Sequence, residues 1–161
     1  NSMIKPLETT QFGVPVSYSK PLSLNLWAKY KAGSEYKDKN GNILPDTDHP
    51  EIYAVLYESV LDGKGNELKL NGSNVQTAPN IVSIAIMNEN TANSLIVNDI
   101  DADEYRFIEI PFIYRQSFDP QKQAAGKYYF TVVFSSSAKG DLFEGAVGSA
   151  LCIDEVEIVT E

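Results

Sequence analysis

Hydrophobic and polar residues alternate along the chain in short runs that Gly, Asn, Asp and Pro separate. Such runs, rich in Val, Ile, Thr and aromatic residues, are typical of β-strands. They lie at residues 22–31, 51–59, 81–88, 105–115, 127–136 and 150–159, with weaker runs near 12–18 and 67–70. No window carries a sustained apolar stripe of helical period, and the best helical candidate is a turn around residues 120–125. The pattern predicts an all-β domain, first a β-sandwich of jelly-roll type and second a closed barrel.

The first strong run shows which of its residues should face the core. Leucines, one alanine and one tyrosine occupy alternate positions: Leu22, Leu24, Leu26, Ala28 and Tyr30. Because side chains of a strand alternate between its two faces, these residues are predicted to be buried. The opposite face then carries Ser23, Asn25, Trp27 and Lys29. The only tryptophan of the chain is therefore predicted to lie on the polar, solvated side of a sheet.

The run at 105–115 has one apolar face and one mixed face. The mixed face includes Glu109, Pro111 and Arg115. We expect Glu109 and Arg115 to share a half-exposed sheet surface with Trp27. Proline cannot donate a ladder hydrogen bond, so Pro111 predicts an edge strand or a bulge.

The last run changes parity within the strand. Leu151 and Ile153 share one face, whereas Val156 and Ile158 belong to the other. A β-bulge near residues 154–155 would bring all four to the same side and would re-aim the Asp154 side chain.

Composition and charge narrow the class of protein. The chain has 161 residues, with 13 Lys and Arg against 22 Asp and Glu, and its net charge is −9 with His neutral. This length predicts one domain, spanning residues 1–161. The acidic balance argues against a nucleic-acid partner and against an anionic membrane surface. No apolar run approaches the ~20 residues of a membrane-spanning segment, and one cysteine permits no internal disulfide.

The sequence lacks the motifs of several common metal-binding and catalytic sites. Neither Asp38-Asn40-Asn42 nor Asp99-Asp101-Asp103 continues with the glycine and the distal glutamate of an EF-hand loop. The only histidine, His49, lies in a polar loop, and no serine stands in a nucleophile elbow. A pair of carboxylates remains possible, as glycoside hydrolysis requires. Glu58 and Glu109 lie within predicted strands and are the best-positioned acids.

Sugar binding needs only an aromatic ring beside hydrogen-bonding groups. The ring packs on the C–H side of a pyranose, and polar side chains bind its hydroxyls. The candidate ligand-binding residues are Trp27, Asn25, Lys29, Tyr53, Tyr57, Glu109 and Arg115.

Three stretches together resemble one family. They are residues 29–33 (KYKAG) after Trp27, residues 48–58 (DHPEIYAVLYE), and residues 134–156, which contain FSSS, GDLFEGAVGS and a strand ending in DEV. They are similar to the putative carbohydrate metabolism domain of surface and secreted proteins of gut anaerobes. The glycines and serines of the last stretch also suit a structural loop, since glycine supplies positive φ and serine satisfies turn backbone groups.

The resemblance implies a galactose-binding-like jelly roll that often follows an immunoglobulin-like domain on an exported lipoprotein at the cell surface or outer membrane. Family members usually have further sequence before the first strand. We therefore expect this chain to be the C-terminal domain of a longer exported protein, with an amino-terminal part of the fold preceding it. Residues 153–156 also resemble the last strand of jelly-roll sugar-binding modules, whose acid often ligates a structural calcium, which implies a calcium ligand at Asp154.

Three functions stay open at this point. The first is a noncatalytic carbohydrate-binding or surface-attachment module with a glycan as its partner. The second is a glycoside hydrolase with a two-carboxylate site. The third is a structural or adhesion domain whose Trp27 surface packs on a partner domain.

Overall fold

The computed structural model describes residues 11–96 and 104–161. Its strands are β1 (Val14–Pro15), β2 (Pro21–Lys31), β3 (Tyr36–Lys37), β4 (Glu51–Glu58), β5 (Val60–Leu61), β6 (Glu67–Leu68), β7 (Ile81–Ile86), β8 (Arg106–Pro111), β9 (Ile113–Tyr114), β10 (Tyr128–Ser135), β11 (Gly145–Ala146) and β12 (Ala150–Thr160). The helices are α2 (Glu89–Leu95), α3 (Pro120–Ala124) and the 3-10 turn η1 (Gly140–Leu142). None of the helices in the described part of the chain is long and apolar enough to cross a membrane.

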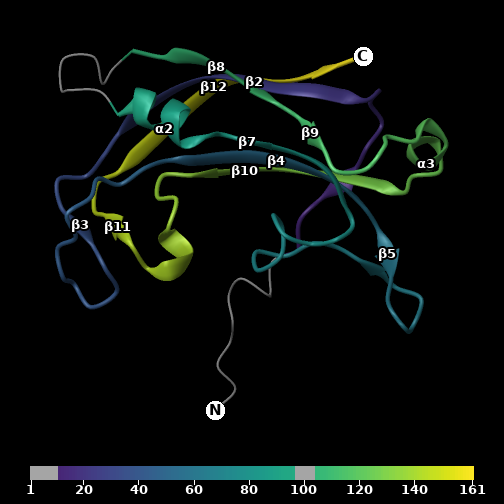
Figure 1. Cartoon of the computed structure of the whole chain (residues 1–161), viewed down its shortest axis with the longest axis horizontal. Helices are drawn as coiled ribbons and strands as arrows, with labels where there is room; N and C mark the ends of the chain where they lie inside the picture. The colour runs from purple at the N-terminus through teal and green to yellow at the C-terminus, as the bar shows by residue number, and fades with distance from the viewer. Residues whose placement is uncertain (1–10, 97–103) are drawn as a thin grey trace.

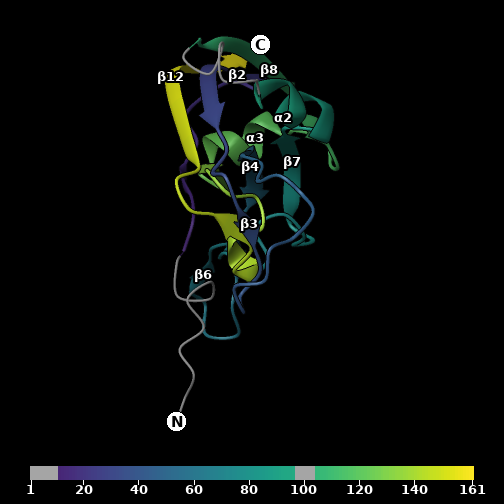
Figure 2. The same ribbon diagram turned by 90° about the vertical axis from the view of Figure 1, so that its left-hand side faces the viewer.

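Two antiparallel sheets form the layers of the fold. A five-stranded sheet has the order β1-β10-β4-β7-β9, and a three-stranded sheet has the order β12-β2-β8. The two sheets lie one above the other, as Figure 1 and the perpendicular view in Figure 2 show. The short pairs β11-β3 and β5-β6 lie outside these layers. The described strands do not close into a barrel, and the prediction of an all-β sandwich is confirmed.

The core between the sheets follows the alternation of β2. Leu24, Leu26 and Ala28 are fully buried, and Tyr30 is nearly so. They pack against alternate residues of β4, including Ile52. The one departure from the predicted set is Leu22, which lies one residue after the start of β2 and is exposed.

The outer face of the five-stranded sheet is covered as well. On β4, Tyr53, Val55 and Tyr57 point away from the main core and form a second buried cluster with residues such as Leu70. Phe12 packs against the same cluster, and the Tyr57 hydroxyl donates a hydrogen bond to its carbonyl oxygen at 2.6 Å. β4 is therefore buried on both faces, which explains its nearly continuous apolar sequence.

The predicted strand at 105–115 is divided between the two sheets. β8 is an edge strand of the three-stranded sheet and ends at Pro111, as the proline predicted. The chain then passes through the buried Phe112, whose backbone N–H donates to the Leu22 carbonyl at 2.9 Å. β9 continues in the five-stranded sheet beside β7.

The predicted bulge in the last strand is present. Asp154 pairs with Trp27 and Glu157 with Asn25, so two residues of β12 lie opposite the single Leu26. Leu151, Ile153 and Ile158 pack against the core. The fourth residue of the predicted set, Val156, lies within the bulge itself and is 46% exposed, so it does not join them.

The helical elements are short. α3 falls where the sequence predicted a turn, and Asp119 caps it by accepting a hydrogen bond from the backbone N–H of Gln121 at 2.8 Å. α2 was not predicted. Its seven residues bury only Ala92 and Leu95, which is too few positions to show a helical stripe in the sequence.

Candidate functional site

The outer face of the three-stranded sheet presents a group of exposed aromatic rings. Trp27 on β2 and Phe107 on β8 are direct cross-strand partners and are 39% and 53% exposed. Their ring centroids lie 5.6 Å apart with an interplanar angle of 60°, an edge-to-face contact. Tyr105, just before β8, is 40% exposed. We call these three rings, with Asn25, Lys29 and Glu109, the aromatic face.

Polar groups flank the rings of the aromatic face. The ammonium of Lys29 lies 5.1 Å from the centroid of the Tyr105 ring, within cation–π distance. On the other side of the Trp27–Phe107 pair, Asn25 lies directly across from Glu109. The Asn25 side-chain oxygen accepts a hydrogen bond from the Ser23 hydroxyl at 2.8 Å. The structure thus brings together Trp27 with Asn25, Lys29 and Glu109, as the alternation predicted.

β12 borders the same face with acidic residues. Asp154 is the cross-strand partner of Trp27, on the side opposite Phe107. One of its carboxylate oxygens accepts the backbone N–H of Glu155 at 2.8 Å. A calcium ion at Asp154 stays a prediction. Within residues 11–96 and 104–161, no group of three or more His, Cys, Asp or Glu side chains could hold a metal.

The structure does not bring Tyr53, Tyr57 or Arg115 to the aromatic face. Tyr53 and Tyr57 are buried on the outer side of the other sheet, because β4 lies in the middle of the five-stranded sheet. Burial raises the pKa of Tyr57 to about 12. Arg115 follows β9, beyond the point where the chain changes sheets, and its guanidinium donates to the Gln76 carbonyl at 3.2 Å.

The two acids proposed for a hydrolytic pair also lie apart. Glu109 lies on β8 in the three-stranded sheet, whereas Glu58 ends β4 in the five-stranded sheet. Glu58 is paired with Lys122 at 2.8 Å, and this hydrogen bond raises the pKa of Lys122. These two carboxylates therefore do not form a two-carboxylate site.

The Asp38-Asn40-Asn42 spacing has a structural explanation. The exposed Asp38 carboxylate accepts the backbone N–H groups of Asn40 and Asn42, each at 2.9 Å, and the Asn42 side-chain amide at 2.9 Å. These hydrogen bonds close a tight loop and lower the pKa of Asp38. The similar Asp99-Asp101-Asp103 spacing lies outside the described residues.

Sequence reasoning missed a buried acid. Asp48 is 1% exposed, and one carboxylate oxygen accepts three hydrogen bonds. The donors are the Ser137 hydroxyl at 2.7 Å, the Ala146 backbone N–H at 2.8 Å and the Ser149 hydroxyl at 2.7 Å. The Ser149 hydroxyl in turn accepts the backbone N–H of Gly33 at 3.0 Å. We call these residues the Asp48 cluster.

The Asp48 cluster joins the three stretches that carry the family resemblance. Gly33 belongs to the first, Asp48 to the second, and the serines to the third. A Cβ atom added at Gly33 would lie 2.4 Å from the Val147 carbonyl oxygen, so only glycine permits this approach. The most specific sequence signature of the chain is thus a structural loop around a buried carboxylate.

Comparisons with known proteins show what the chain is similar to. A family model described as "Putative carbohydrate metabolism domain" matches residues 1–159. No curated protein matches the chain. A crystal structure from Bacteroides thetaiotaomicron, titled a putative glycoside hydrolase, is 36% identical with a TM-score of 0.81, and the match covers 100% of this chain and 44% of that one. A second, from Bacteroides vulgatus and also titled a putative glycoside hydrolase, is 33% identical with a TM-score of 0.77, covering 99% of this chain and 59% of that one. The chain thus spans less than two thirds of either relative.

Proposed function

This chain belongs to the putative carbohydrate metabolism domain family, and on that premise we propose that it is a noncatalytic carbohydrate-binding domain. Its proposed setting is an exported protein at the cell surface that handles glycans, with other domains such as an immunoglobulin-like one beside it. The family supports a role connected with carbohydrate. The aromatic face supports the more specific role of binding.

The observation that carries the proposal is the exposed Trp27–Phe107 pair. Large rings are costly to leave in water, and an exposed cluster of them usually marks a binding surface. The rings offer flat apolar area to the C–H side of a sugar, and the flanking Asn25, Lys29 and Glu109 offer donors and acceptors for its hydroxyls. The surface is an open sheet, so it suits the side of a polysaccharide chain better than one enclosed sugar.

A glycan-array screen with the isolated chain tests the proposal. Trp27→Ala and Phe107→Ala should each abolish or strongly weaken binding. Phe143→Ala is the matched control, because Phe143 is also an exposed ring but lies at the end of η1, away from the aromatic face. Binding that survives Trp27→Ala unchanged would contradict the proposal.

Glycoside hydrolysis is a second candidate, favoured by the titles of the two similar solved structures. Its test is release of reducing ends from a polysaccharide panel by the full-length protein. Turnover lost on changing one acid of this chain would establish hydrolysis and overturn the noncatalytic proposal. A third outcome would assign the aromatic face to packing against another domain. In that case, quenchers would reduce the Trp27 fluorescence in the isolated chain but not in the full-length protein.

A further inference from the structure

An open cavity of about 460 Å³ lies on the outer face of the five-stranded sheet. Its walls come from β4, β10, the segment 72–77 and the turn 137–141. This volume falls within the ~300–1,000 Å³ range of small-molecule sites. The aromatic face belongs to the other sheet, so the two surfaces lie on opposite sides of the sandwich. We call this cavity the Glu51 pocket.

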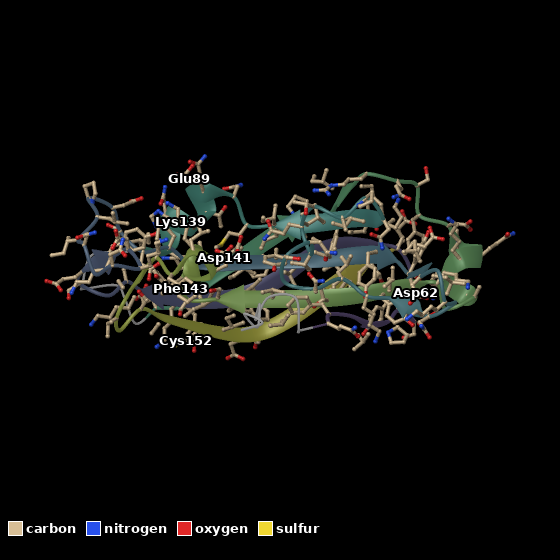
Figure 3. The ribbon with its side chains drawn as sticks, turned by 90° about the horizontal axis from the view of Figure 1, so that it is seen from below. Asp62, Glu89, Lys139, Asp141, Phe143 and Cys152 are labelled. Carbon is tan, nitrogen blue, oxygen red and sulfur yellow. The ribbon has the colours of Figure 1, made fainter. Side chains whose placement is uncertain are left out.

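Two acids and an amide provide its polar groups. The half-buried Glu51 accepts a hydrogen bond from the Gln76 side-chain amide at 3.1 Å. Gln76 is held in place because its backbone carbonyl accepts the Arg115 guanidinium at 3.2 Å. Asp141, in η1, also lines the pocket, and Figure 3 views the molecule from this side. Among the hydrogen bonds of the described residues, none uses the second oxygen of Glu51 or the carboxylate of Asp141.

The electrostatics of the pocket restrict its ligand. None of the described lining residues is Lys, Arg or His, so anionic ligands such as phosphates or uronic acids would face two uncompensated acids. Among the described residues, no group of three or more His, Cys, Asp or Glu side chains could hold a metal ion in this pocket. Burial raises the pKa of Glu51, and the negative charge of Asp141 adds to this effect.

The remaining lining suits a neutral molecule with many hydroxyls. Glu51 and Asp141 accept O–H groups, while the Gln76 amide can both donate and accept. The Ser135 hydroxyl donates a hydrogen bond to the Ser137 carbonyl and can only accept from a ligand. The partly buried Phe12 and Val133 line the wall and offer apolar area for C–H groups. The Ser137 side chain lines the same pocket and donates to Asp48, so the Asp48 cluster fixes this wall.

We propose that the Glu51 pocket binds a single neutral sugar unit, at a site separate from the aromatic face. The choice of sugar as the ligand class rests on the proposed carbohydrate-binding role, whereas the location and the preference for an uncharged ligand rest on the pocket itself.

The test is an NMR titration of the whole chain with neutral hexoses, with a uronic acid as the charged comparison. Neutral hexoses should shift the amide signals of residues 51, 76 and 141. Glu51→Gln and Asp141→Asn should each weaken binding by about tenfold or more, since hydrogen bonds to a charged acceptor are the strong ones. The uronic acid should bind more weakly than the hexoses. Gln76→Ala provides a further variant in case a change of either acid impairs folding.

Two controls separate this proposal from the one above. Asp62→Asn changes an acid that Figure 3 places far from Asp141, and it should leave the affinity unchanged. In Trp27→Ala, neutral hexoses should still shift the amide signals of residues 51, 76 and 141. Shifts at the pocket that persist in Trp27→Ala support the Glu51 pocket whatever happens at the aromatic face. The Glu51 pocket proposal would be overturned if no neutral hexose shifts the pocket signals, or if Trp27→Ala abolishes those shifts. This holds even if the aromatic face binds glycans.

Discussion

The carboxylate of Asp48 accepts a hydrogen bond from the Ser149 hydroxyl at 2.7 Å, although 101 residues separate them in the chain. The same oxygen also accepts the Ala146 backbone N–H and the Ser137 hydroxyl. A buried carboxylate is costly unless it is fully hydrogen-bonded. Here its donors come from both sides of η1, so the acid fixes the path of the loop between β10 and β12.

Asp48→Ala should lower the free energy of unfolding by roughly 3–5 kcal/mol, because three donors lose a charged acceptor in a buried place. Urea denaturation measures this change. Asp38→Ala is the matched control, since Asp38 also accepts three hydrogen bonds but these bonds are exposed to solvent. Its cost should stay near or below about 1 kcal/mol. Equal costs for the two variants would contradict the role of Asp48.

Gly33→Ala should lower the free energy of unfolding by about 1–3 kcal/mol, because the new methyl group meets the backbone of residues 146 and 147. Gly63→Ala adds the same methyl group where nothing lies within 4 Å, and should be neutral or slightly stabilising. Thermal melts of both variants check the difference. A Gly33→Ala melting curve that matches the wild type would show that the loop at 146–147 can move aside.

Glu155→Gly should raise the free energy of unfolding by up to about 1 kcal/mol. Glu155 has a φ of +49°, a left-handed conformation that disfavours residues with a Cβ atom. Glu157→Gly, in the same strand but outside the left-handed region, should instead lower the free energy by about 0.5–1 kcal/mol. Opposite signs for the two changes in urea denaturation would confirm the bulge geometry, and a shared sign would contradict it.

Trp27→Ala should separate binding from stability. The indole makes an edge contact with Phe107 and is 39% exposed, so its removal should lower the free energy of unfolding by about 1–3 kcal/mol, less than for a core tryptophan. Affinity for a glycan found on the array should fall by about tenfold or more, measured by calorimetry. A large loss of stability with unchanged affinity would make Trp27 a packing residue.

Glu51→Gln should change the pH dependence of stability. The pKa of Glu51 is raised in the folded protein, so between the ordinary value of 4.5 and the raised value the folded state binds more protons than the unfolded state. Its contribution to stability therefore falls as the pH rises through that window. Glu51→Gln should be more stable than the wild type at pH 7, and this gain should disappear below pH 4.5.

Denaturation at pH 4 and pH 7 measures the effect, with Glu89→Gln on α2 as an exposed control. A gain of the same size at both pH values would show that the charge of Glu51 is not its cause.

The sequence predicts which residues share one face of a strand better than it predicts what covers that face. Alternation in β2 placed Trp27, Asn25 and Lys29 on the outer surface, and the structure confirms that arrangement. Alternation does not tell what covers the second face of a strand. For β4 the available signal was its nearly unbroken apolar run, which is typical of a strand buried on both sides. That signal would have placed Tyr53 and Tyr57 inside.

The sequence carries only a weak signal for the path of the chain after β8 and none for the burial of Asp48. Pro111 marked the end of β8, but only the structure shows that Arg115 beyond it belongs to the other sheet. Asp48 lies in a polar segment where an acid is normally solvated. The residues that bury it are 89 to 101 positions away, so no local pattern could reveal its role.

The edges of the two sheets bear on self-association. β1 and β9 have two residues each, and β8 ends in a proline, so these edges give a second chain little to pair with. β12 is the long edge, with 11 residues. Its bulge interrupts the regular backbone, and Asp154, Glu155 and Glu157 gather negative charge along this edge, which disfavours pairing with a second copy. The same bulge that shapes the border of the aromatic face therefore protects the protein against strand-mediated aggregation.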